Sequence, residues 1–238
     1  MEYLNSTGSY INYNLLNVIN MSNSTFDFNA FIKESKDVLV NPKSYFSTMK
    51  TTGGIAEPLI KAVIYGAVAG IIAFIWSLLK IGGGTLGIFG GAVGVMAIIW
   101  YLIIAIIGLF VGAVIVLVIS AICKGNTDFE ANVRVTAAVM VIMPISALLG
   151  FITGLNLTAG SIIGLAVNLF ALYLLYHGLI QALKANPGTT KIVMYVLAAL
   201  LVLFFLLGLG AKNRASKFMK DFDKGDLQEM IEDVEKNK

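Results

Sequence analysis

The sequence predicts an all-α fold: a polytopic membrane helix bundle with five transmembrane helices and an N-terminal amphipathic interfacial helix. Charged residues are absent from four long stretches, which are residues 62–79, 81–123, 135–183 and 192–211. A bilayer core is about 30 Å thick, and about 20 apolar helical residues cross it. Hydrophobic residues make up 58% of the chain and charged residues only 13%, which is far from the composition of soluble domains.

The first 25 residues are polar and rich in Asn, Ser and Tyr. They lack the basic start and the apolar run of a signal peptide. We expect residues 1–25 to be either disordered or a mis-assigned start, because Met21 offers an alternative to Met1.

We predict that residues 26–57 form an amphipathic segment on the cytoplasmic side that leads into the first span, and we call it the lead-in. A solvated linker is the alternative. Apolar residues fall near one helical face and charged residues surround the other, which is typical of a helix in the headgroup region. Asn41 followed by Pro42 predicts an N-cap and the first position of a second short helix. The apolar face of the first helix carries Phe28, Phe31, Ile32 and Leu39.

Residues 58–211 predict the transmembrane bundle, and its first span ends near Leu79. The charge-free run 81–123 would be about 65 Å long as one helix, which is twice the thickness of a bilayer. Glycines crowd its first third, where helix propensity is therefore poor. We expect a loose or re-entrant stretch at residues 81–94 and a span at 95–123. Full crossing of the glycine-rich stretch, giving six spans, is the alternative.

The run from 135 to 183 must hold two spans, which we place at 131–152 and 158–184. Pro144 lies inside the first of these and removes a backbone donor, so a kink is expected there. A turn at Pro187 and Gly188 precedes a fifth span at residues 190–211. The turn between the two long spans is placed at Gly150, Gly154, Asn156 and Gly160.

Residues 212–238 form a charged tail, with a basic collar followed by an acidic part that predicts a short amphipathic helix. The positive-inside rule places the N-terminus in the cytoplasm in both the five-span and the six-span model. The two models divide the basic residues equally, so charge alone leaves the side of the tail open. In a prokaryote the location would be the cell membrane.

The residues available for chemistry exclude several classes of function. Cys123 and His177 are the only cysteine and the only histidine, so zinc sites built from these residue types are excluded. No predicted span core contains a charged residue, which removes the parts of a proton relay or a catalytic carboxylate pair. We therefore expect no enzyme, no metal and no cofactor. The net charge of +3, concentrated beside the spans, favours membrane lipids over nucleic acid as partners.

His177 lies near the end of the fourth predicted span, beside Tyr173, Tyr176 and Gln181. An ionisable group in a membrane is by default a functional-site hypothesis. The alternative, which we favour, is a neutral histidine that reaches interfacial water.

Glycine pairs at helical spacing predict close packing between helices, because missing side chains let the backbones approach. One interpretation is a homo-oligomer, and the other, which we favour for most pairs, is packing within one bundle. The pairs are Gly66 and Gly70, Gly108 and Gly112, Gly150 and Gly154, and Gly160 and Gly164.

Charged residues between the second and third spans lie on a predicted cytoplasmic loop, where we expect them to be solvated. Together with residues before and at the first span, they are candidates for a surface that binds membrane or cytoplasmic proteins. The candidates are Asn41, Pro42, Glu57, Pro58, Asp128, Glu130 and Arg134.

The order of these parts resembles the Yip domain family of Ypt/Rab-interacting multipass proteins. The matching segments are Val38-Leu39-Val40-Asn41-Pro42-Lys43, Gly53-Gly54-Ile55-Ala56-Glu57-Pro58, Gly125-Asn126-Thr127-Asp128-Phe129-Glu130, the proline at 144 and Tyr176-His177-Gly178-Leu179. The resemblance implies five spans, a cytoplasmic N-terminus and no catalytic residue. Eukaryotic members are associated with vesicle traffic and Rab GTPases. This chain lacks their long N-terminal region and Asp-Leu-Tyr-Gly-Pro type motif, so it is more similar to prokaryotic members, and a trafficking role is not carried over.

The function that these observations predict is a non-enzymatic membrane scaffold or membrane-organising, trafficking-like factor. The alternative is a transporter or channel for a small solute or lipid, suggested by the glycine-rich stretch and by Pro144. An intramembrane enzyme comes third, because it would depend on His177 as its only base.

Overall fold

The computed structural model describes residues 27–79, 81 and 93–208, and all the regular secondary structure within them is helical. The chain divides into two compact units, Met1–Glu34 and Ser35–Lys238. The described part of the first unit is the beginning of helix α2 (Phe28–Val40).

Helix α2 begins where the amphipathic helix was predicted, and a side chain satisfies the free donors of its first turn. The Oδ1 atom of Asp27 accepts hydrogen bonds from the backbone N–H groups of Asn29 and Ala30. In the second unit, the Ser35 hydroxyl lies 2.8 Å from the Tyr65 hydroxyl, and Val38 is buried. The second half of this helix is therefore docked on the protein.

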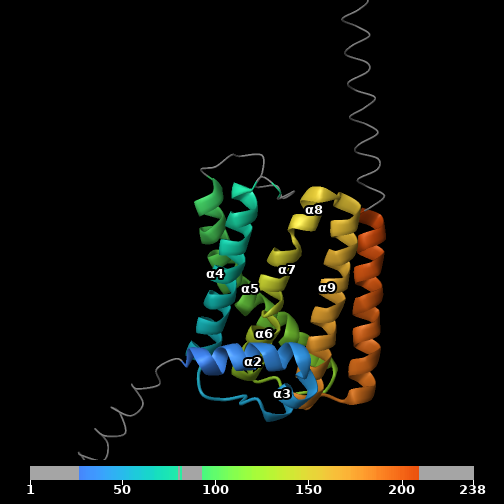
Figure 1. The fold of residues 1–238 in the computed structure, drawn as a ribbon. Helices are drawn as coiled ribbons and strands as arrows, with labels where there is room; N and C mark the ends of the chain where they lie inside the picture. The colour runs from blue at the N-terminus through green and yellow to red at the C-terminus, as the bar shows by residue number, and fades with distance from the viewer. Residues whose placement is uncertain (1–26, 80, 82–92, 209–238) are drawn as a thin grey trace, which may run out of the picture. The chain divides into compact units, whose positions relative to one another are not determined.

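The second unit is a helical bundle (Figure 1). Among its described residues, five helical segments are long and apolar enough to cross a membrane, which confirms the predicted five-span bundle. These segments are Ala56–Leu78, Ile98–Ile122, Phe129–Leu155, Leu157–Ala182 and Pro187–Gly208. The helices are α3 (Pro42–Thr48), α4 (Ala56–Leu78), α5 (Val93–Ile122), α6 (Phe129–Val139), α7 (Ile142–Leu149), α8 (Phe151–Leu155), α9 (Leu157–His177), the π-helix η2 (Gly178–Ala182) and Pro187–Gly208, which we call the Pro187 helix.

Small side chains hold the centre of the bundle together. A Cβ atom on Gly66 would lie 2.6 Å from Ala105 Cβ, and one on Gly70 would lie 2.9 Å from Ile98 Cα. Helices α4 and α5 therefore approach as closely as their backbones permit. Beside this contact lies a buried cluster of Ala62, Leu109, Ala113, Val133 and Ala137, contributed by α4, α5 and α6.

The third span is broken, as Pro144 predicts, but the break precedes the proline. Helix α6 ends at Val139 and α7 begins at Ile142. Pro144 is the third residue of α7, where its missing N–H would have no helical partner. At the other end of α7, the Ala147 carbonyl accepts a 3.0 Å hydrogen bond from the Trp76 indole, which ties the broken span to α4.

Asparagines begin three helices, and one of them corrects a prediction. Asn41 caps α3 as expected, accepting from the Ser44 N–H, and Asn156 caps α9. Pro187 was predicted to lie in a turn before a span that starts at 190. It is instead the first residue of its helix, because Asn186 accepts the Thr189 N–H at 3.1 Å and acts as the cap.

Of the five spans found among the described residues, the Pro187 helix is the least buried by the rest of the protein. Only 6% of its most apolar stretch is buried in the protein, against 33% for Phe129–Leu155. The predicted segments 1–25 and 212–238 lie outside the described residues, as do residues 82–92 of the stretch expected to be re-entrant. The division of the chain into four segments stays a prediction.

Candidate functional site

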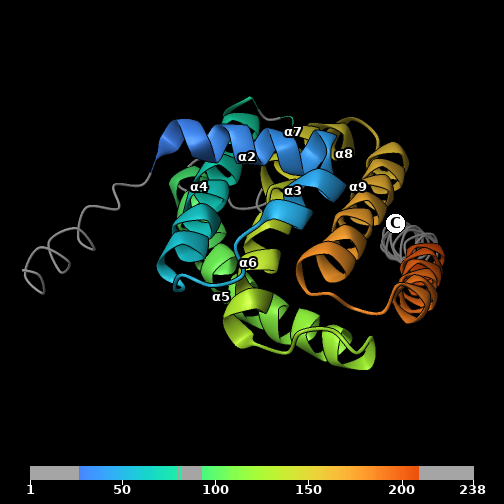
Figure 2. The same ribbon diagram turned by 90° about the horizontal axis from the view of Figure 1, so that it is seen from below.

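Charged side chains in the described part of the second unit gather at one end of the bundle, which we call the charged end. It is the end at which α4, α6 and the Pro187 helix begin and α5 and η2 finish (Figures 1 and 2). No charged residue occurs at the opposite end within the described residues. The charged residues of these elements and their connections are Lys43, Lys50, Glu57, Lys61, Lys124, Asp128, Glu130, Arg134, Lys184 and Lys191.

Arg134 on α6 is the centre of a buried ionic cluster. Its side chain is only 6% exposed. Its Nη1 donates to Glu57 Oε2 at 3.0 Å, and its Nε donates to Glu130 Oε1 at 3.1 Å. Its Nη2 donates to the Gly54 carbonyl at 2.9 Å. Each nitrogen of the guanidinium therefore has an acceptor, as a buried charge requires.

The loop before α4 closes the cluster through its backbone. Gly53 and Gly54 have φ angles of +124° and +89°, which L side chains rarely adopt. This conformation directs the Gly54 N–H to Glu130 Oε1 at 2.6 Å, while the Gly54 carbonyl accepts from Arg134. The loop, α4 and α6 are thus joined through one arginine.

Glu57 connects two cations and also reaches solvent. Lys61, one turn further along α4, lies with its Nζ 2.7 Å from Glu57 Oε1. The Lys61 side chain is 11% exposed and the Glu57 side chain 45% exposed. Two largely buried cations therefore share one half-exposed carboxylate, each through a different oxygen. The cluster of Gly54, Glu57, Lys61, Glu130 and Arg134 is called the Arg134 cluster below.

The two other connections at the charged end are bound to each other. The Asn126 N–H donates to the Leu183 carbonyl at 2.7 Å, and the Asn186 N–H donates to the Cys123 carbonyl at 2.8 Å. A Cβ atom on Gly125 would lie 3.0 Å from Ala185 Cβ. The absence of a side chain at this position lets the connections 123–128 and 183–186 approach, so they lie on the same side of the bundle.

Polar side chains hold the first of these connections in place. Asn132 is fully buried, and its Nδ2 donates to the carbonyls of Asn126 and Asp128 at 3.1 and 2.7 Å. The Ser120 hydroxyl donates to the Asn126 carbonyl at 2.8 Å. Asp128 caps α6 by accepting the Ala131 N–H at 2.9 Å. These contacts give the exposed loop one fixed conformation.

Helix α3 docks on the charged end through one aromatic side chain. Phe46 is fully buried, and a Cβ atom on Gly178 would lie 3.4 Å from its ring and 2.7 Å from Val135 Cγ1. The missing side chain at Gly178 therefore leaves room for Phe46 against η2 and α6. Pro42, at the start of α3, is also buried. The main apolar residue of α3 therefore packs inside the protein.

The structure brings together only part of the predicted partner surface. Glu57, Glu130 and Arg134 meet in one cluster, and Asp128 lies on the same helix start. Pro58 is buried. Asn41 caps α3 and Pro42 begins it, and within the described residues the Asn41 side chain accepts from Ser44 and does not reach the cluster.

One expectation is wrong for two of these residues. Asp128, Glu130 and Arg134 were predicted to be solvated on a loop. Asp128 is exposed before α6, but α6 begins at Phe129, so Glu130 lies in the helix and Arg134 is buried within it. The cluster members missed by sequence reasoning are Gly54 and Lys61. Two sequence signals point to them. The pair Gly53-Gly54 lies shortly before Glu57, and Lys61 follows that glutamate by four residues, which is one helical turn.

The packing glycines differ in what surrounds them. Besides Gly66 and Gly70, Gly112 meets the Thr136 side chain and Gly160 meets the backbone of Thr153, so these glycines contact other helices of the same chain. Gly108 and Gly164 have open space where a Cβ atom would stand. Gly150 meets only its own turn at Ala147 and Ser146, and Gly154 is exposed on α8.

Two aromatic rings of α9 lie beside His177. The rings of Tyr173 and Tyr176 lie at 4.7 and 5.3 Å from it in edge-on geometry. The described residues contain no group of His, Cys, Asp and Glu that would hold a metal ion. The two tyrosine rings pack against the imidazole.

Within the described residues, five helical segments are apolar and long enough to cross a membrane, and they define an integral multipass membrane protein. The Yip1 domain model matches residues 36–210, which is more than half of the chain, and the chain belongs to that family. Comparison with curated proteins and with solved structures gave no match. The family resemblance seen in the sequence is confirmed.

Proposed function

We propose that this protein is a non-enzymatic membrane scaffold that binds a protein partner at its charged end. The observation that carries the proposal is the Arg134 cluster, in which a buried arginine fixes the Gly53-Gly54 loop, α4 and α6. A rigid polar surface loses little conformational entropy on binding. Its outward-facing parts are the half-exposed Glu57 and the exposed loops around Thr52 and Thr127.

The orientation that this proposal requires is a cytoplasmic charged end. Lysines of the second unit, including Lys50, Lys124 and Lys184, gather there, and described residues at the opposite end carry no charge. Basic residues in short connections are retained on the cytoplasmic side of a membrane. The lead-in that ends in α3 would then be cytoplasmic as well, and in a prokaryote the membrane would be the cell membrane.

Photo-crosslinking tests this proposal in native membranes. A photoreactive amino acid replaces Thr52 or Thr127, which are exposed at the charged end, and Leu155, which is 71% exposed at the opposite end, as the control. We expect one reproducible crosslinked protein from the first two positions and none of that mass from the third. The absence of any adduct from positions 52 and 127, with the protein correctly inserted, would overturn the proposal.

A homo-oligomer remains part of the proposal. Gly108 and Gly164 are the packing glycines with open space beside them, so a second copy would find two close-approach sites there. Disulfide crosslinking of Gly108→Cys in membranes, with exposed Val111→Cys as a neighbouring control, separates a specific contact from random collision.

A second candidate function is passage of a small solute or lipid. The third span is interrupted between Val139 and Ile142, and the Pro187 helix is weakly embedded. Both features permit helix movement within the membrane. Flux of a small solute or a labelled lipid across liposomes containing the protein, compared with empty liposomes, tests this candidate, and equal flux in the two would remove it.

A further inference from the structure

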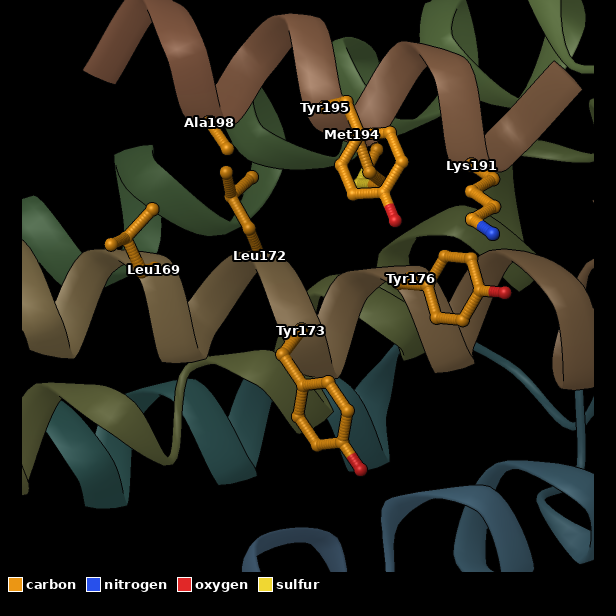
Figure 3. A pocket seen from close by; sticks show the side chains of 8 residues that line it. All are labelled: Leu169, Leu172, Tyr173, Tyr176, Lys191, Met194, Tyr195 and Ala198. Carbon is orange, nitrogen blue, oxygen red and sulfur yellow. The ribbon is translucent and has the colours of Figure 1, made fainter. Parts of the chain in front are cut away.

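A pocket of about 320 Å³ lies between α9 and the Pro187 helix (Figure 3). Figure 3 shows Lys191 and Tyr195 directed from the Pro187 helix toward α9, with Tyr176 opposite them on α9. The ring of Tyr173 extends away from the Pro187 helix in this view. The pocket is open on one side, and in a membrane that side meets lipid.

Polar and apolar groups are separated along the pocket. Lys191 and Tyr176 lie toward the charged end, because the Pro187 helix begins there and α9 finishes there. Ala198 lies seven residues further into the membrane, which is about 10 Å along a helix. Leu169 and Leu172 face it from α9. The pocket is therefore cationic and hydroxylated at the surface and hydrocarbon-like in its depth.

The charge of the pocket is uncompensated. Lys191 is the only cation among the lining residues, and none of them is a carboxylate. The Nζ atom of Lys191 lies 5.8 Å from the centre of the Tyr195 ring, a weak cation–π contact at an exposed site. Lys191 has no ion-pair partner in the part of the chain that the structure describes.

The weak embedding of the Pro187 helix leaves this space available. Tyr195 is 64% exposed and Val196 is 54% exposed, although both belong to a membrane span. Met194 is the one pocket residue that is buried on this helix. Apolar side chains in a bilayer contact either protein or acyl chains, and here the protein contributes little.

We propose that this pocket binds one anionic phospholipid. Its phosphate lies at Lys191, with the Tyr176 and Tyr195 hydroxyls as further donors, and one acyl chain lies along Leu172 and Ala198. A charged amine with an apolar cleft directly below it matches the division between headgroup and chain in such a lipid. The inference does not rest on the scaffold role, because its evidence is the pocket between α9 and the Pro187 helix and not the Arg134 cluster.

Native mass spectrometry of the full chain, released from nanodiscs, tests the proposal. The nanodiscs contain phosphatidylglycerol and phosphatidylcholine with identical acyl chains. We expect one retained lipid and a preference for phosphatidylglycerol of about fivefold, the effect of one lysine at a membrane surface. Lys191→Met should abolish the preference, and Lys191→Arg should keep it. Lys50→Met, an exposed lysine at the same end outside the pocket, should not change it.

A second variant tests the apolar half. Ala198→Phe should fill the depth of the pocket and reduce retention of both lipids, while the melting temperature stays within a few degrees of the unmodified protein. Equal preference in Lys191→Met and in the unmodified protein would overturn the proposal. An equal loss in Lys50→Met would also overturn it, by showing a diffuse surface charge. Displacement by inorganic phosphate, with Ala198→Phe without effect, would show an anion site and not a lipid site, which contradicts the proposal as well.

Discussion

Arg134 and Glu57 lie 77 positions apart in the sequence, and Nη1 of the arginine donates a 3.0 Å hydrogen bond to Oε2 of the glutamate. The contact joins the start of the third span to the start of the first. Because the arginine is buried and the glutamate is half exposed, the pair holds the bundle together from inside and presents charge outside. Removal of Arg134 and removal of Glu57 should therefore change the stability of the bundle by different amounts.

We expect Arg134→Met to lower the free energy of unfolding by about 3 kcal/mol, the lower end of the range for breaking a buried ion pair, since its carboxylates keep access to water. Arg134→Lys should recover only part of this, because one ammonium group cannot reproduce three directed contacts. Thermal unfolding in detergent measures the change. Unfolding is detected by the reaction of a maleimide with the Cys123 thiol, which is buried in the folded protein. Equal melting temperatures for Arg134→Met and the exposed control Lys50→Met would contradict the account.

Glycine positions give a matched pair of variants. Gly66→Ala places a Cβ atom 2.6 Å from Ala105 Cβ and 3.0 Å from the Tyr101 carbonyl, so α4 and α5 must separate. We expect a loss of about 1–3 kcal/mol from overpacking. Gly108→Ala enters open space in α5 and should be neutral or slightly stabilising. Unfolding of both variants in the same detergent compares them. In detergent that keeps the protein monomeric, a greater loss at position 108 than at 66 would contradict the close contact of α4 and α5 at Gly66.

Phe46 and Phe204 distinguish protein packing from lipid exposure. Phe46 is fully buried beside Gly178, whereas Phe204 is 66% exposed on the Pro187 helix. Phe46→Ala should cost about 3–5 kcal/mol, because it leaves a cavity under α3. Phe204→Ala should change stability little in detergent. Limited proteolysis gives the readout. Lys50 is already exposed, but trypsin needs an unfolded segment, which release of α3 should provide in the first variant only. Resistance of Phe46→Ala to trypsin would show that α3 is held by other contacts.

Much of the fold follows from the sequence because lipid imposes a simple rule. The lengths without charge favour five spans over six. Asn41-Pro42 predicts the start of α3, since cap and proline act within one turn. Pro187 was misplaced because a proline is equally compatible with a turn and with a first helical residue. Asn186, immediately before it, is the signal that distinguishes them.

The candidate site was predicted less well, for a physical reason. Arg134 and Glu57 are far apart in the sequence, and no local sequence pattern predicts that the start of α6 lies beside the start of α4. From the sequence, an arginine near the start of a span is expected to be solvated. Here the Gly54 carbonyl and the carboxylates of Glu57 and Glu130 accept its hydrogen bonds and allow it to be buried. Likewise, spacing alone gives Gly66 and Gly108 the same prediction. Only the packing of α4 on α5 separates them.

Side-specific cysteine labelling tests the central claim most directly, which is that the lead-in loop and the 123–128 connection share the cytoplasmic side. In a Cys123→Ala background, single cysteines at Thr52, Thr127 and Leu155 occupy exposed positions at the two ends of the bundle. In intact cells or sealed vesicles of known orientation, an impermeant maleimide should label position 155 from outside. Positions 52 and 127 should react only after the membrane is opened. Labelling of 52 and 127 from opposite sides would contradict the account.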